Sequence, residues 1–250
     1  MKMRYWRTIP ALLALLALPA AGQDNMWGDI DALNEAKDFA ASGRLLMEIA
    51  AQQEGSADYR WRMARYHFNL SDNASDEAVI AENIYAGLEF ARQSLAADSN
   101  SAGAHGYYGI LIGRAGEIEG TKQKIINSYE VGDHTLRAIQ IAPQEDTWQH
   151  VMGRWNYTLA DLSWIERTIA SIVYASPPKA SFADAEGYFR AAARLAPDDV
   201  RHPVWLAKTL LELDQDEQAK SALEAALALP AKSESDRMLQ AEARELLEDL

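Results

Sequence analysis

Along most of the chain, apolar positions recur at the three- and four-residue spacing of amphipathic helices, and proline, glycine and other small residues separate these stretches. The most regular stretch lies near the C-terminus, where Ala207, Ala219 and Ala226 are small, Leu223 is large and Pro230 follows. Ala207 and Ala219 are twelve residues apart. Small residues at this interval let two antiparallel helices cross closely, and proline ends the second helix. The pattern therefore predicts a pair of packed helices.

The same pattern occurs in three further places, so the chain contains a helical repeat. The corresponding positions of the earlier second helices are Ala185, Phe189, Ala192 and Pro197; Val131, Thr135, Ala138 and Pro143; and, more faintly, Gly87, Ala91, Ser94 and Ser99. Two antiparallel helices in roughly 34 residues are typical of a tetratricopeptide unit. The three earlier units exceed this length by about ten, ten and twenty residues. We predict an all-α, tetratricopeptide-like right-handed helical solenoid of about four helix pairs, with inserted helices and a C-terminal capping helix.

The N-terminus has the three parts of a secretory signal peptide. They are a basic segment, an apolar run of ten residues and a small-residue segment: Lys2, Arg4 and Arg7, then Ile9–Leu18, then Ala20–Gly22. The apolar run is too short to span a bilayer as a helix, which needs about 20 residues. We expect cleavage before Gln23, and an uncleaved N-terminal anchor is the alternative.

Three parts are therefore expected: a signal peptide at 1–22, an N-terminal helical cap at 23–56 and the repeat domain at 57–250. The signal predicts a periplasmic or secreted protein. After residue 22 there is no apolar run of spanning length, so we expect no transmembrane segment in the mature chain.

Charge and cysteine content narrow the choice of partners. The formal net charge is −13, and loss of the signal would remove three basic residues and no acids, giving −16. This excess disfavours nucleic acids and anionic membranes as partners of the whole surface. The chain has no cysteine, which excludes disulfides, thiolate metal sites and cysteine nucleophiles.

Several short motifs resemble the regulator of microtubule dynamics family. They are Trp61–Arg65, Ala104-His105 with Tyr108, Gly120–Ile125, His150–Trp155, Trp164-Ile165 with Ile169-Ala170 and Pro177-Pro178, and Ala185–Phe189. The resemblance covers the chain from about Tyr59 onward. It implies a helical-repeat adaptor without catalytic residues. Animal members are associated with microtubules and organelle contact sites, and one type resembles a phospholipid-binding domain. A secretory signal stands here in place of a mitochondrial or membrane anchor, which argues against microtubules as the partner.

The chain shows no pattern typical of catalysis. None of its five histidines is spaced in sequence as a metal pair, and the sequence has no nucleophile elbow, phosphate loop or dinucleotide fingerprint. Gly113, Gly116 and Gly120 are interpreted as a helix break and turn in the second unit. We therefore predict that the protein is not an enzyme and needs neither a metal nor another cofactor.

The first helices of the units are expected to line a concave groove. The repeat alignment directs seven polar or aromatic residues toward it: Arg62, Tyr66, His150, Arg154, Tyr157, Arg201 and Lys208. The whole set of groove positions includes four basic residues and no acid, which favours an anionic ligand because arginine binds carboxylate or phosphate through two hydrogen bonds. The alternative is that these cations pair with acids on neighbouring second helices.

The longest insertion is expected to form an extra helix over 161–175 with an apolar stripe that contains Trp164, Ile165 and Ile169. This stripe either packs inside the solenoid or forms a wall of an apolar cavity. Lys122 and Lys124 would then lie at the rim of the cavity. We predict an adaptor that binds a protein or peptide in its groove, and the alternative is a binder of an anionic lipid or small amphiphile beside the insert.

Overall fold

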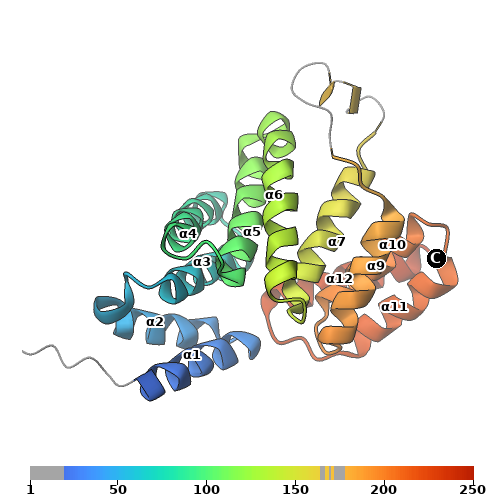
Figure 1. Cartoon of the computed structure of the whole chain (residues 1–250). Helices are drawn as coiled ribbons and strands as arrows, with labels where there is room; N and C mark the ends of the chain where they lie inside the picture. The colour runs from blue at the N-terminus through green and yellow to red at the C-terminus, as the bar shows by residue number, and fades with distance from the viewer. Residues whose placement is uncertain (1–19, 164–166, 169, 172–177) are drawn as a thin grey trace, which may run out of the picture.

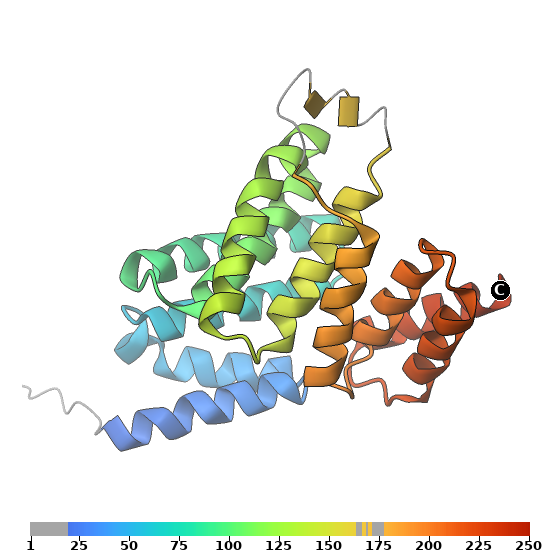
Figure 2. The same ribbon diagram turned by 45° about the vertical axis from the view of Figure 1, so that its right-hand side comes forward.

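The computed structural model describes residues 20–163, 167–168, 170–171 and 178–250, and it arranges them in eleven α-helices. In chain order these are α1 (Ala20–Glu35), α2 (Phe39–Gln53), α3 (Ala57–Asp72), α4 (Glu77–Ala97), α5 (Ala102–Glu119), α6 (Thr121–Ile141), α7 (Asp146–Ala160), α9 (Phe182–Leu195), α10 (Arg201–Leu211), α11 (Asp216–Ala228) and α12 (Glu234–Glu248). Figures 1 and 2 show the helices following one another in pairs from the N-terminal to the C-terminal end.

The pairing confirms the predicted repeat. The four units are α3 with α4, α5 with α6, α7 with α9, and α10 with α11, and each second helix also packs on the first helix of the next unit. The pair α1 and α2 precedes them and packs on α3, while α12 follows and packs on α10 and α11. The fold is thus a tetratricopeptide-like solenoid with a helix pair at one end and a capping helix at the other.

Serine and aspartate side chains fix where many of these helices begin. Ser56, Asp76, Ser101, Ser181 and Ser233 each accept a hydrogen bond from a backbone N–H in the first turn of α3, α4, α5, α9 and α12 respectively. Such caps satisfy donors that have no partner within the helix. The repeat boundaries therefore follow from local sequence as well as from packing.

The glycines of the second unit differ in role from the prediction. Only Gly120 separates two helices, and its φ of +94° explains why glycine is used there. Gly113 and Gly116 lie inside α5, where an added Cβ would come within 3.2 Å of Val131 and 3.0 Å of the Lys124 backbone. They permit close packing of α6 on α5, so the prediction of a helix break at these two positions was wrong.

The insertions of about ten residues in the first two units lengthen the helices. In the second unit α5 has 18 residues and α6 has 21, compared with 11 and 13 in α10 and α11. The third insertion is described only in part: Arg167, Thr168, Ala170 and Ser171 are helical. The predicted wall residues Trp164, Ile165 and Ile169 lie outside the described residues.

The two ends of the solenoid meet through side chains. The Nζ of Lys37, in the α1–α2 turn, lies 2.5 Å from Asp236 Oδ1 of α12. Ser235 Oγ donates to Asp72 Oδ2 at the end of α3 over 3.1 Å. These contacts bring the α1–α2 turn and the end of α3 against α12.

Candidate functional site

Three side chains from the first helices of the third and fourth units converge around the indole ring of Trp205. The Arg154 guanidinium carbon lies 4.4 Å from the centroid of the Trp205 ring, and Lys208 Nζ lies 4.2 Å from it. The Tyr157 ring meets the same indole edge-on at 5.5 Å. We call Arg154, Tyr157, Trp205 and Lys208 the Trp205 cluster. Cations over an indole face are attracted by the electrons of the ring.

Two members of the Trp205 cluster already have acidic partners. Lys208 Nζ contacts Glu242 Oε1 of α12 at 2.6 Å, and the Tyr157 hydroxyl donates to Glu212 Oε1 at 3.5 Å. Burial, together with the Glu212 charge, raises the pKa of Tyr157 to about 12. The phenol therefore stays protonated at physiological pH and donates to Glu212.

Arg154 is different because its guanidinium forms no ion pair or hydrogen bond with the described residues. Burial lowers the pKa of Arg154 from its usual value; the negative charge of Glu117 opposes this shift, and the positive charge of Arg114 adds to it. Arginine still keeps its charge under these conditions. The cluster thus contains a partly buried cation without a counter-ion among these residues.

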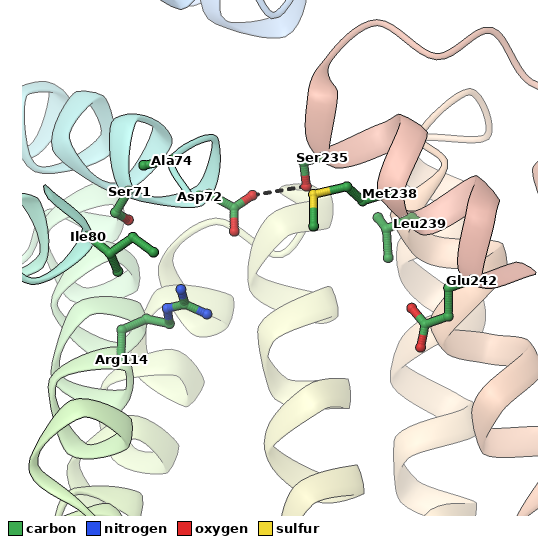
Figure 3. Close-up of a pocket in the computed structure, with 9 residues that line it drawn as sticks. All are labelled: Ser71, Asp72, Ala74, Ile80, Arg114, Ser235, Met238, Leu239 and Glu242. Atoms are coloured by element: carbon green, nitrogen blue, oxygen red, sulfur yellow. Dashed lines mark hydrogen bonds between the residues drawn. The ribbon is translucent and has the colours of Figure 1, made fainter. Parts of the chain in front are cut away.

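An inner cleft of about 460 Å³ opens between α3, α4 and α5 on one side and α12 on the other. Figure 3 shows its lining residues, with Arg114 and Glu242 directed into the space between the two sides: Ser71, Asp72, Ala74, Ile80, Arg114, Ser235, Met238, Leu239 and Glu242. Glu242 connects the cleft to the Trp205 cluster through Lys208. Arg154 is close enough to Arg114 and Asp72 for their charges to act on its pKa.

The N-terminal groove candidates are covered by α1 and α2. Arg62 binds both oxygens of Asp31 in α1, at 2.9 and 2.6 Å, and its guanidinium carbon lies 4.6 Å from the Trp27 ring and 4.0 Å from the Trp61 ring. The Tyr66 ring packs over Gly43 of α2. These two residues hold the N-terminal helix pair onto the first repeat.

His150 and Arg201 belong to a network that joins α7 to α10. His150 Nδ1 lies 3.1 Å from Nδ1 of His202, and His202 Nε2 lies 2.9 Å from Asp146 Oδ2. If His202 donates from Nε2 to the carboxylate, its Nδ1 accepts the proton of His150. Burial and the neighbouring His202 hold the pKa of His150 well below its usual value, in keeping with a neutral donor.

The same network contains the side-chain geometry of a possible metal site. Ligand atoms of Asp146, Asp199 and His202 lie within 4.8 Å of one another. However, Arg201 Nη2 contacts Asp199 at 2.8 Å and Asp146 at 3.5 Å, and His202 Nε2 bonds Asp146, so both carboxylates already have partners within the network. Arg201 thus makes this cluster a structural ion-pair network and a poor host for a metal ion.

The remaining predicted rim residues lie at the start of α6. Lys122 and Lys124 are exposed in its first turns. Their relation to the apolar stripe of the insert falls outside the described residues, so the predicted cavity beside the insert stays a prediction.

Three functional or structural residues were missed by sequence reasoning. Trp205 lies two residues before Ala207, the small residue at the helix crossing of the fourth unit. Its closeness to this repeat position could have indicated that Trp205 faces the inner surface. Arg65 shares Asp31 with Arg62 at 2.6 Å. Arg167 of the insert donates to the carbonyl oxygens of Leu159 and Ala160 at the end of α7. A basic side chain there stabilises the C-terminal end of a helix.

The geometry defines a tetratricopeptide-like helical-repeat protein with a charged, aromatic inner surface. The sequence model of the family described as Regulator of microtubule dynamics protein 1-3 matches residues 26–250. The chain therefore belongs to the regulator of microtubule dynamics family, as its motifs predicted.

Individual relatives agree with this assignment. Regulator of microtubule dynamics protein 1 of Bos taurus is 35% identical over 208 residues, which cover 81% of this chain and 65% of the relative. The protein of the same name from Caenorhabditis elegans is 30% identical over 218 residues, covering 87% and 96% respectively. The chain thus spans slightly less than two thirds of the bovine relative.

Solved structures support the fold alone. A thermophilic TPR protein of Thermus thermophilus superposes with a TM-score of 0.62 at 14% identity, covering 89% of this chain and 99% of the other. Pseudomonas aeruginosa pilF gives 0.53 at 15% identity, covering 92% and 86%. Within the described part of the chain, none of the helices combines the length and apolar character needed to cross a membrane.

Proposed function

We propose that this protein is a non-catalytic adaptor whose inner cleft binds a protein or peptide partner. The observation that carries the proposal is the Trp205 cluster, in which a partly exposed indole and two cations lie beside the cleft. Aromatic and arginine side chains are enriched among the residues that dominate binding energy at interfaces. Tetratricopeptide-like folds present such residues on the inner surface formed by their first helices.

We further propose that the adaptor works after export, in the periplasm or outside the cell. This rests on the basic, apolar and small-residue segments at 1–22. N-terminal sequencing of the protein from a periplasmic fraction is expected to begin at Gln23. Recovery of the chain only in the cytoplasm with its first residues intact would refute export. The microtubule role in the names of the relatives would then become a reasonable candidate for this chain.

An anionic lipid is the alternative ligand, and the cleft favours it less. Among the residues that line the cleft, Asp72, Arg114 and Glu242 are charged. Burial of an acyl chain against these groups would remove water from charges without replacing its hydrogen bonds. A peptide supplies polar backbone and side-chain groups that can do so.

The proposal is tested by purifying the full protein from its own cells and measuring what remains bound by native mass spectrometry. We expect a stoichiometric protein partner on the wild type and a large loss of it with Trp205→Leu. Tyr85→Ala is the control, because Tyr85 is an exposed aromatic on α4 that belongs neither to the cleft lining nor to the Trp205 cluster. Circular dichroism melting checks that both variants are folded. A bound lipid in place of a protein, or a partner unaffected by Trp205→Leu, would reject the proposal.

A further inference from the structure

The four basic groove candidates are not equivalent once their partners are known. Arg62 binds Asp31, Arg201 binds Asp199, and Lys208 binds Glu242, at 2.6–2.8 Å for the shortest contact of each pair. All three acids come from segments other than the second helices of the units, but they pair with the cations all the same. Only Arg154, among the described groove candidates, has neither an ion pair nor a hydrogen bond for its guanidinium.

The position of Arg154 holds this guanidinium ready for a ligand. Its planar group lies over the Trp205 ring at 4.4 Å, and stacking on an aromatic ring leaves the N–H groups at the edge of the guanidinium available. Arg114, the basic residue that lines the cleft, already pairs with Glu117 at 3.4 Å. Among the described residues of this region, Arg154 is therefore a cation without a direct acidic partner, held against a rigid surface.

The surrounding acids limit the charge that a ligand can carry. Asp72 and Glu242 line the cleft, and Glu117 acts on Arg154 from α5. The three cations Arg114, Arg154 and Lys208 balance these three acids in total charge, so a group with one negative charge is tolerated better than a dianion. A carboxylate carries one charge and matches the two-pronged geometry of guanidinium.

We infer that Arg154 is the anchor for a carboxylate of the bound peptide, either its C-terminus or an aspartate or glutamate side chain. The inference rests on the proposed adaptor function and names the chemistry of its ligand. The peptide would enter through the inner cleft, whose 460 Å³ lies in the range of ligand sites and accommodates the end of a chain more readily than a folded domain. Apolar Met238 and Leu239 on α12 would contact the residues next to the carboxylate.

The test is a selection of random twelve-residue peptides with free C-termini on the immobilised full protein. Each enriched peptide is resynthesised with its C-terminus amidated or with its acids changed to amides. We expect one of these changes to weaken binding by about tenfold or more, the scale of a charged hydrogen bond. Arg154→Gln should weaken binding of the unmodified peptide to a similar degree. Combining Arg154→Gln with the modified peptide should weaken binding little more than either change alone.

The control variant is Arg190→Gln. Arg190 lies on α9, pairs with Glu186 and belongs neither to the cleft lining nor to the Trp205 cluster, so affinity should stay within about twofold. If circular dichroism shows that Arg154→Gln is poorly folded, Arg154→Lys replaces it. Lysine keeps the positive charge but cannot form the two parallel hydrogen bonds of a guanidinium group. The affinity of Arg154→Lys for the unmodified peptide should therefore lie between the affinities of the wild type for the unmodified and the amidated peptide.

The possible results separate this inference from the proposed function. Enriched peptides whose affinity is unchanged by Arg154→Gln would overturn the carboxylate anchor and leave the adaptor proposal intact. A selection without enriched peptides would overturn both. Binding of phosphatidate vesicles, but not of peptides, through Arg154 would also overturn the inference, because the anion would then be a lipid phosphate.

Discussion

Lys37 Nζ lies 2.5 Å from Asp236 Oδ1, and this contact joins the α1–α2 turn to the C-terminal helix across 199 residues. The Lys37 backbone has a φ of +59°, which directs the turn between the two helices. Asp236 is 1% exposed and also accepts a hydrogen bond from the Lys232 backbone N–H at 2.8 Å. The ends of the solenoid are therefore held together by a nearly buried ion pair beside the inner cleft.

Loss of Lys37 should destabilise the protein by more than an ordinary surface charge does. Lys37→Ala leaves the Asp236 carboxylate buried without its cation, and we expect a loss of about 1–3 kcal/mol in the free energy of unfolding. Urea denaturation of Lys37→Ala, Asp236→Asn and the double variant gives the coupling energy directly. The side chain of Lys232 is the control: it pairs with the exposed Asp198, so Lys232→Ala should cost under about 1 kcal/mol. Equal losses for the two lysines would show that the ends are not held by this pair.

Two glycines should respond to alanine in opposite directions. At Gly106 an added Cβ would lie 2.2 Å from Trp148 Cζ3, inside a core where the indole cannot move freely, so Gly106→Ala should cost about 1–3 kcal/mol. At Gly187, exposed in α9, nothing lies within 4 Å of the added Cβ. Gly187→Ala should therefore stabilise the protein by up to about 1 kcal/mol through helix propensity. Urea denaturation measures both changes, and destabilisation by Gly187→Ala would contradict this account.

Small residues also show how much of the fold could be predicted from the sequence. Small residues at the crossing points, such as Ala207 and Ala219, are set by local spacing, so the helix pairs were predicted correctly. Gly113 was misjudged because a glycine that permits packing and one that breaks a helix look alike along a sequence. The difference depends on whether a neighbouring helix, here α6, approaches that position.

The candidate site was less predictable because charges pair across long distances. Arg62 was predicted to face the groove, but it binds Asp31 of α1, which lies 31 residues earlier in the chain. Lys208 pairs with Glu242, which is 34 residues later. The repeat alignment gives the direction of a side chain and not the residues that meet it, so it could not distinguish Arg154 from the three paired cations.

Asp31 should be one of the most important acids for stability. It binds Arg62 and Arg65 together, and although burial raises the pKa of Asp31, the two arginines outweigh this and lower it below its usual value. Asp31→Asn leaves the nearly buried Arg65 without its acidic partner and Arg62 with the exposed Asp58 alone, and we expect a loss of about 2–4 kcal/mol by urea denaturation. Asp58→Asn is the matched control. Asp58 contacts the same Arg62 at 3.2 Å but is 61% exposed, so its loss should be within about 1 kcal/mol. A similar loss of stability for Asp31→Asn and Asp58→Asn would mean that burial of the Asp31–Arg62 ion pair adds nothing to stability.

Stability should also fall as the pH decreases from 7 to 5, and His150 should account for part of the decrease. Burial, the neighbouring His202, and the positive charges of Arg201 and Arg154 lower the pKa of His150 in the folded protein, while Asp199 opposes them. The unfolded chain binds a proton at this side chain below about pH 6.5, whereas the folded protein does not. Acid therefore favours the unfolded state, by up to about 1.4 kcal/mol per pH unit for this one group.

His150→Gln removes this titration and isolates the contribution of His150 from other effects of the substitution. The loss of packing and hydrogen bonding in this variant lowers stability by a similar amount at every pH. The loss of the titrating imidazole, in contrast, changes the slope of stability against pH. Urea denaturation at intervals from pH 5 to pH 8 should give a shallower slope below pH 6.5 for His150→Gln than for the wild type. His134→Gln should reduce the slope as well, because burial and His105 lower the pKa of His134, which is less buried than His150. Parallel curves for the wild type and His150→Gln would show that His150 is protonated equally in the folded and unfolded states, and the neutral His150–His202 hydrogen bond would then have to be abandoned.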